Sequence, residues 1–282
     1  MGIKITVDNN FFDNYDKHPI QEDKKLIISA FRRKYFSFYP TPEVLAELLG
    51  IYSTRRKPLL IRYSKILLSM VDYRIFNYWS RIIRHDLGLL ENESIFLGSK
   101  ETEYAKSIFG ALANGRKPKN IEEILNLVKQ EKEDNYKKYK ATQKRIFNKF
   151  KDEKITVPKM SFDEFYNDKT IMNMRRDLIR YLFLRAGKSV SDEKTNKITD
   201  TPRRYPYFST SSRVFMALFY RYVVLGRGVR EGDHYDQYYL IYLTDLDYLV
   251  SNDLGLKELA KDVFGGSDKI IDFDGLVGLA KQ

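Results

Sequence analysis

Short apolar runs alternate with longer amphipathic stretches along this chain of 282 residues. Runs of apolar, β-branched or aromatic residues that end at turn residues are typical of buried strands. Four runs fit this description: Ile3 to Val7, Tyr35 to Phe38, Tyr248 to Val250 and Lys269 to Asp272. Residues 94–97 are a further candidate strand.

Between the strands, apolar residues recur with the spacing of amphipathic helices. The helical stretches are 20–34, a helix beginning at Thr41-Pro42, 59–85, 100–113, 121–151, 169–186, one beginning near Asp236, and 254–264. The polar segment 187–205 predicts a mobile loop, and Asp8-Asn9-Asn10 predicts a turn. Strands separated by helices predict an α/β fold with a mostly parallel central sheet.

The composition excludes several classes of function. The chain has no cysteine, which excludes disulfide scaffolds, zinc–thiolate sites and thiol catalysis. Its three histidines, His18, His85 and His234, lack the spacing of a zinc-binding pair. No apolar run approaches the roughly 18 residues that a membrane span requires. We therefore expect a cytoplasmic protein with no membrane partner.

The net charge of +11 is unevenly distributed along the chain. Residues 117–205 carry 23 basic and 14 acidic side chains, whereas residues 206–282 carry 8 basic and 11 acidic ones. Basic segments attract phosphate backbones, while clustered carboxylates repel them unless a cation intervenes. A solvated helix face is the competing explanation for the basic region.

Four carboxylates are expected at one edge of the predicted sheet. Asp8 and Asp253 each follow a strand, Asp236 lies at a helix N-terminus, and Glu47 lies in the helix after the second strand. In parallel α/β sheets, ligands collect outside the carboxyl ends of the strands. A single aspartate after a strand is usually a helix cap, but four converging carboxylates require a cation. Oxygen ligands alone favour Mg²⁺ or Mn²⁺.

The same residues resemble the PIN-like nuclease family. The stretch Ile5-Thr-Val-Asp8-Asn-Asn10 is similar to the first strand of that family, and Val44-Leu-Ala-Glu47-Leu is similar to its glutamate-bearing helix. Asp236 to Asp253 resembles the closing half, where an aspartate begins a helix that is followed by a buried strand and Ser251-Asn-Asp253. The resemblance implies a PIN-like α/β/α sandwich with a metal-dependent nuclease site.

The resemblance implies that Asp8, Glu47, Asp236 and Asp253 are catalytic and bind the metal. Ser251 then supports the site, and Asn10 orients its first turn. Two alternatives stay open: Glu43 in place of Glu47, and Asp233 in place of Asp236. Glu47 is preferred because it follows the Val-Leu-x-Glu pattern, and Asp236 because its distance from Asp253 suits one helix and one strand.

The resemblance covers residues 1–116 and 206–282, which we predict to form a discontinuous nuclease core. Residues 117–205 have no counterpart in a minimal domain and are predicted to be a basic helical insertion. The leading hypothesis is an endonuclease that acts on RNA rather than DNA, with the insertion holding phosphates. The predicted nucleic-acid-binding residues are Lys137, Lys138, Lys144, Arg175 and Arg176.

Two other functions are compatible with the same sequence. The first is a non-catalytic PIN-like module that binds nucleic acid or assembles with proteins through the basic insertion. The second is a contact between residues 117–205 and a protein partner or a second copy of the chain. Binding that survives a chelator distinguishes a binding module from a metal-dependent nuclease.

Overall fold

The computed structural model describes residues 2–53, 56–70, 74–89, 94–152, 159–227 and 233–282. Its four strands form one sheet in the order β2-β1-β3-β4, and every neighbouring pair is parallel. The strands are β1 (Ile3–Val7), β2 (Phe36–Phe38), β3 (Tyr248–Val250) and β4 (Ile270–Ile271). The prediction of an α/β fold with a parallel sheet is therefore confirmed.

The two central strands are buried because helices cover both faces of the sheet. Ile5 and Val7 of β1 and Leu249 of β3 have no exposed surface. The register pairs Ile5 with Tyr248 and Val7 with Val250, so that β1 and β3 end side by side. The residues that follow them therefore meet at one edge of the sheet.

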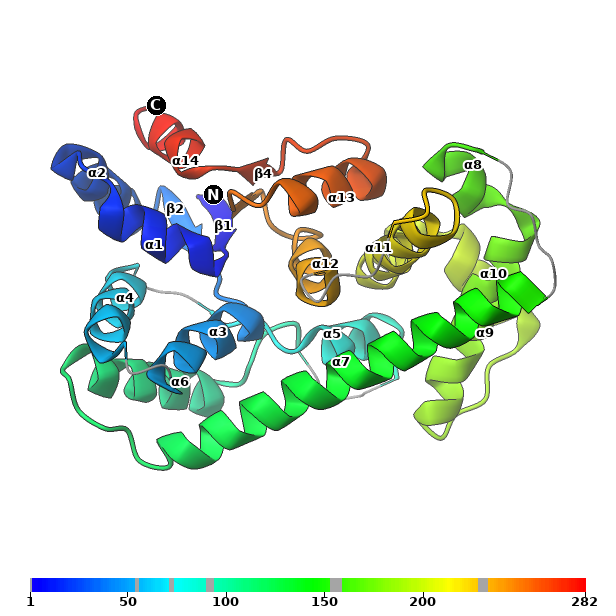
Figure 1. The fold of residues 1–282 in the computed structure, drawn as a ribbon, viewed down its shortest axis with the longest axis horizontal. Helices are drawn as coiled ribbons and strands as arrows, with labels where there is room; N and C mark the ends of the chain where they lie inside the picture. The colour runs from blue at the N-terminus through cyan, green and yellow to red at the C-terminus, as the bar shows by residue number, and fades with distance from the viewer. Residues whose placement is uncertain (1, 54–55, 71–73, 90–93, 153–158, 228–232) are drawn as a thin grey trace.

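Helices lie on both faces of the sheet (Figure 1). The connection from β1 to β2 contains α1 (Asn9–Lys17) and α2 (Gln21–Arg32), whereas α13 (Leu254–Phe264) connects β3 to β4. These connections run in opposite directions along the sheet. Because parallel connections are right-handed, they lie on opposite faces. The C-terminal helix α14 (Phe273–Ala280) packs on α1 and α2, and α12 (Asp233–Tyr242) packs on α13.

A long helical segment connects β2 to β3. Its elements are α3 (Pro42–Ser53), α4 (Lys57–Ser69), α5 (Trp79–Asp86), α6 (Ser99–Ala113), α7 (Ile121–Asp152), α8 (Phe162–Asn167), α9 (Lys169–Arg185), α10 (Asp192–Asp200), the 3₁₀ turn η1 (Pro202–Arg204), α11 (Pro206–Val223) and α12. Figure 1 shows α7 extending from α3 and α6 toward α8, α9 and α10. None of the described helices is both long enough and apolar enough to span a membrane.

Residues 117–205 share hydrophobic core with the rest of the chain. Phe162 and Phe165 of α8 pack on Tyr220 of α11, with ring centroids 5.7 and 5.4 Å apart. A second, smaller cluster joins α9 and α10 to α5 and α11, and consists of Ile83, Leu87, Leu89, Ile179, Phe183, Ile198 and Phe208. Helix α7 also packs on α3, and its first residue, Ile121, belongs to the main core. The predicted insertion therefore packs on the predicted core at several places.

The predicted helix over residues 59–85 is wrong. Helix α4 ends at Ser69 and α5 begins at Trp79. Between them, Phe76 forms an isolated antiparallel bridge with Phe96, and the Asn77 side chain donates a hydrogen bond of 3.2 Å to the Ser94 carbonyl. The candidate strand at 94–97 is reduced to this bridge. Pairing between distant segments interrupts the helix, and local periodicity does not reveal such pairing.

The predicted loop over residues 187–205 is also wrong, because it contains α10. The Ser191 hydroxyl accepts a hydrogen bond from the backbone N–H of Lys194, 3.2 Å away, and so caps this helix. Two of its threonines are buried, and their hydroxyls are satisfied within the helix: Thr195 donates to the Ser191 carbonyl and Thr199 to the Thr195 carbonyl, each at 2.9 Å. At the N-terminus, the predicted turn at Asp8-Asn9-Asn10 is the start of α1, with Asp8 as N-cap.

Candidate carboxylate site at the sheet edge

The candidate site lies where the sheet changes its direction of winding. From β1 the chain moves to β2 on one side, and from β3 it moves to β4 on the other. A crevice forms at such a switch point, outside the carboxyl ends of the two central strands. Asp8 follows β1 and Ser251 follows β3, so both residues lie at this point.

Asp8 is buried at the switch point, with 6% of its surface exposed. One carboxylate oxygen, Oδ2, accepts hydrogen bonds from the Ser251 hydroxyl at 2.5 Å and from the Asn10 amide at 3.2 Å. The other, Oδ1, accepts one from the Phe11 backbone N–H at 3.1 Å. Burial raises the pKa of Asp8, and these hydrogen bonds oppose the shift. Both predicted supporting residues, Asn10 and Ser251, therefore contact Asp8.

Asp253 is connected to Asp8 through Ser251. The Asp253 backbone N–H donates to the Ser251 hydroxyl oxygen at 3.0 Å, while that hydroxyl donates to Asp8. The Asp253 carboxylate accepts a hydrogen bond of 2.9 Å from the Leu256 N–H and caps α13. Asp8 and Asp253 thus cap helices as well as line the edge of the sheet, as expected for aspartates that end strands.

Glu43 and Glu47 approach the same region from α3. The Tyr239 hydroxyl of α12 donates to Glu47 at 3.3 Å, and the Tyr242 hydroxyl donates to Glu43 at 3.2 Å. The charges of Glu47, Asp8 and Glu43 all contribute to raising the pKa of buried Tyr239, although desolvation is the largest cause. The three carboxylates are therefore near enough for their charges to act on Tyr239, and Glu47 contacts its hydroxyl.

The carboxyl group of Glu43 has a strongly raised pKa. Burial raises its pKa to about 7; the hydrogen bonds from Tyr242 and Thr41 oppose this shift, and the nearby charge of Glu47 adds to it. Among the described residues, its Oε2 atom is buried without a hydrogen-bond partner. A buried carboxylate oxygen without a donor is costly unless it is protonated or bound to a cation.

The side chains of Asp233 and Asp236 lie outside the described residues, although both positions belong to α12. Asp236 precedes Tyr239 by three positions, so the two lie on neighbouring parts of one helix face. The alternative between Asp233 and Asp236 stays open.

The donor set of this region fits a hard divalent cation. The candidate ligands are carboxylate oxygens, which Mg²⁺ and Mn²⁺ prefer. Within the described part of the chain, no three acidic or histidine side chains stand close enough to enclose a metal ion. The side chain of Asp236, the fourth sequence-predicted ligand, lies outside the described residues.

The predicted phosphate-binding residues differ in accessibility. Lys137 and Lys144 are exposed on α7, whereas the side chain of Lys138 lies outside the described residues. Arg176 is half-buried and donates a hydrogen bond of 3.3 Å to the Asn173 side chain.

Arg175 does not belong to an exposed basic surface. Only 6% of it is exposed, and its guanidinium lies 4.1 Å from the centre of the Tyr166 ring. The guanidinium of Arg213 lies 4.8 Å from the same ring. Arg175 therefore packs α9 against α8, and its assignment as a phosphate contact is corrected to a structural one. Regular helical spacing of arginines did not reveal which of them faces the core.

Tyr239 is a site residue that the sequence prediction missed. It lies in a run of aromatic and aliphatic residues, Tyr238 to Leu243, that reads as core, and all six are in fact buried. Its spacing of three from Asp236 was the available signal.

No protein-family model, curated protein or solved structure matches this chain.

Proposed function

We propose that the chain is a metal-dependent endonuclease of the PIN-like type that hydrolyses phosphodiester bonds in RNA. The observation that carries the proposal is the position of Asp8 and Asp253, which are joined through the Ser251 hydroxyl at the switch point of a parallel sheet. Carboxylates in such proximity repel one another, and a divalent cation relieves the repulsion. This is the edge where α/β proteins bind ligands.

Asp8, Glu47, Asp253 and Asp236 are the residues that would hold Mg²⁺ or Mn²⁺. When bound, such a cation supplies Lewis-acid stabilisation of charge on the phosphodiester oxygens. Ser251 fixes the Asp8 carboxylate by its hydrogen bond, and it fixes the backbone of Asp253 by accepting from its N–H. Tyr239 fixes Glu47 in the same way.

The charge distribution supports a nucleic-acid substrate. The net charge is +11, and α7 presents exposed Lys137 and Lys144. Basic side chains bind phosphate backbones without regard to base sequence. RNA is preferred over DNA on the basis of the family resemblance.

Cleavage of labelled single-stranded RNA and DNA in Mn²⁺, Mg²⁺ or chelator tests the proposal. The informative variant is Asp8→Asn/Asp253→Asn, and the control is Asp272→Asn. Asp272 also follows a strand and caps a helix, by accepting from the Gly275 N–H at 2.8 Å, but it follows the edge strand β4. We expect metal-dependent cleavage of RNA that falls by on the order of 100-fold or more in the double variant alone. Cleavage that persists in chelator or in the double variant contradicts the proposal.

A second candidate function, a nucleic-acid-binding module without catalysis, is favoured by one observation. The Tyr239 hydroxyl already donates to Glu47 and so compensates part of the negative charge without a metal. This candidate predicts RNA binding of equal strength in Mn²⁺ and in chelator, with no cleavage in either. If the chain is a metal-dependent nuclease, RNA binds more strongly in Mn²⁺ than in chelator, because the cation reduces the repulsion between the carboxylates and RNA.

A further inference from the structure

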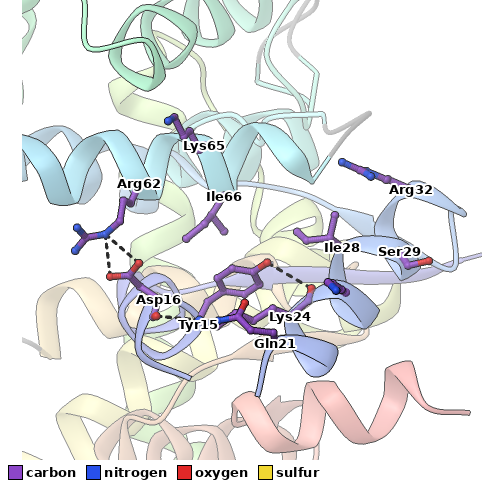
Figure 2. A pocket seen from close by; sticks show the side chains of 11 residues that line it. Tyr15, Asp16, Gln21, Lys24, Ile28, Ser29, Arg32, Arg62, Lys65 and Ile66 are labelled. Atoms are coloured by element: carbon purple, nitrogen blue, oxygen red, sulfur yellow. Dashed lines mark hydrogen bonds and ion pairs between the residues drawn. The ribbon is translucent and has the colours of Figure 1, made fainter. Parts of the chain in front are cut away.

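A basic cavity lies away from the carboxylates, between α1, α2 and α4 (Figure 2). Its volume is about 560 Å³, and its lining contains five basic side chains but a single carboxylate, Asp16. The basic residues come from two helices, α2 and α4, and are Lys24, Lys25, Arg32, Arg62 and Lys65. Such a surplus of positive charge in a hollow attracts anions.

Two of these cations are held in place by protein atoms. The Arg62 guanidinium pairs with the Asp16 carboxylate at 3.0 Å, and the Lys24 amine donates to the Asp16 carbonyl at 3.0 Å. The single carboxylate of the cavity is therefore already engaged. This leaves Lys25, Arg32 and Lys65, which are exposed and have no hydrogen bond or ion pair with any residue that the structure describes. Three cations at the cavity are thus available to an anionic ligand.

The rest of the lining consists of two polar residues, Gln21 and Ser29, and an apolar part formed by Tyr15, Ile28 and Ile66. Tyr15 is half-buried, and Ile28 and Ile66 are also largely removed from solvent. Figure 2 shows these three side chains between Arg62 on one side and Arg32 on the other. An aromatic ring beside aliphatic side chains suits a nucleobase, because every base has a π-face that stacks. The Lys24 amine also lies over the Tyr15 ring, 5.7 Å from its centre. Basic side chains next to such a ring suit the phosphate of the same ligand.

We infer that this cavity binds a nucleoside phosphate, with the phosphate on Lys25, Arg32 and Lys65 and the base against Tyr15, Ile28 and Ile66. The phosphate has two sources: a free nucleotide or the phosphorylated 5′ end of an RNA. Asp8 is the N-cap of α1 and Asp16 lies in its last turn, eight residues further on, so the cavity lies about 12 Å from Asp8 along this helix. Only the RNA source rests on the proposed function.

Equilibrium titrations in chelator test this inference without any contribution from cleavage. The probes are adenosine 5′-monophosphate, inorganic phosphate, and one short RNA carrying either a 5′-phosphate or a 5′-hydroxyl. The test variant is Arg32→Ala/Lys65→Ala. Its control is Arg33→Ala/Lys100→Ala, which removes the same charge from exposed residues outside the cavity. Thermal unfolding of both variants establishes that they are folded.

We expect the test variant to bind the phosphorylated probe at least about tenfold more weakly than wild type, because charge-assisted hydrogen bonds are lost with the cations. We expect the control variant to bind it as wild type does. If wild type binds the 5′-phosphorylated RNA more tightly than the 5′-hydroxyl RNA, and binds the mononucleotide more weakly, the ligand of the cavity is the phosphorylated end of an RNA. Mononucleotide binding at least as tight as that of the RNA identifies a free nucleotide.

Three results overturn the inference: no saturable binding of any probe, equal binding by wild type and the test variant, or inorganic phosphate binding as tightly as the mononucleotide. RNA cleavage that fails while nucleotide binding succeeds contradicts the proposed function and leaves this site standing.

Discussion

The Ser251 hydroxyl donates a hydrogen bond of 2.5 Å to the carboxylate of Asp8, although the two residues are 243 positions apart in the chain. Parallel pairing of β1 with β3 brings them together, because Val7 and Val250 are register partners and each residue of the pair follows one of them. The same hydroxyl oxygen accepts from the Asp253 N–H. One serine therefore sets the positions of two candidate ligands.

We predict that Ser251→Ala destabilises the fold by about 1–3 kcal/mol, since it removes the shortest hydrogen bond to the buried Asp8 carboxylate and the acceptor of the Asp253 N–H. Unfolding in urea measures the change. Ser189→Ala, at an exposed serine, is the control and is expected to leave stability unchanged. Equal stability of the two variants contradicts the structural role assigned to Ser251.

Elements with a strong local pattern were predictable from the sequence. The strands at 3–7 and 248–250 and the helix at 254–264 have the predicted bounds. The strands end at Asp8 and Ser251, and the helix lies between its N-cap Asp253 and its C-cap Gly265. The proximity of Asp8 to Ser251 was predictable for the same reason, since two parallel strands that each end at a polar residue present both at one edge.

Long-range interactions explain the predictions that failed. The Phe76–Phe96 bridge divides the helix predicted over 59–85. The stacking of Arg175 on Tyr166 buries an arginine that the helical pattern alone does not distinguish from exposed ones. The hydrogen bond from Tyr239 to Glu47 joins residues 192 positions apart, which no local pattern signals.

Glu43 and Glu47 are predicted to respond differently to removal of their charge. Glu43→Gln is expected to bind Mn²⁺ as wild type does and to unfold at an equal or higher temperature in chelator at pH 8, since a buried charge is removed with little change of shape. Glu47→Gln is expected to lose Mn²⁺ affinity by about tenfold or more, because a carboxylate ligand is lost. Titration of Mn²⁺ into both variants is the measurement. Loss of affinity in Glu43→Gln alone identifies Glu43 as the ligand instead.

Asp86 is predicted to make stability depend on pH. Its carboxylate accepts a hydrogen bond of 2.8 Å from the Phe208 N–H in the first turn of α11, while burial raises its pKa to about 6. Because this pKa is higher in the folded chain than its ordinary value of 3.8, the stabilising contribution is full below about pH 4 and is lost as the pH rises through 6.

The free energy of unfolding that is lost through Asp86 over this pH range is on the order of 2 kcal/mol. Asp86→Asn keeps an acceptor for α11 but does not titrate, so we expect its stability to vary less between pH 4 and 7. Urea unfolding across this range compares the two proteins. Parallel pH profiles contradict the assignment.

Exposed and buried basic residues of the insertion are predicted to have different roles. Lys137→Ala/Lys144→Ala is expected to weaken RNA binding and to reduce the dependence of log affinity on log salt by about two, roughly one for each phosphate contact. Arg175→Ala is expected to lower the free energy of unfolding by about 1–2 kcal/mol through lost packing on Tyr166. RNA titrations at several salt concentrations, together with urea unfolding, separate the two effects. A lysine variant with the wild-type salt dependence contradicts the phosphate contacts.

Binding of Mn²⁺ to the purified chain, measured by isothermal titration calorimetry, tests most directly whether the carboxylates at the switch point form a metal site. The comparison is between wild type, Asp8→Asn, and Asp272→Asn as the matched strand-ending control. We predict saturable binding by wild type and Asp272→Asn, and its loss in Asp8→Asn. Absence of binding by the wild type, or equal binding by Asp8→Asn, contradicts the metal site.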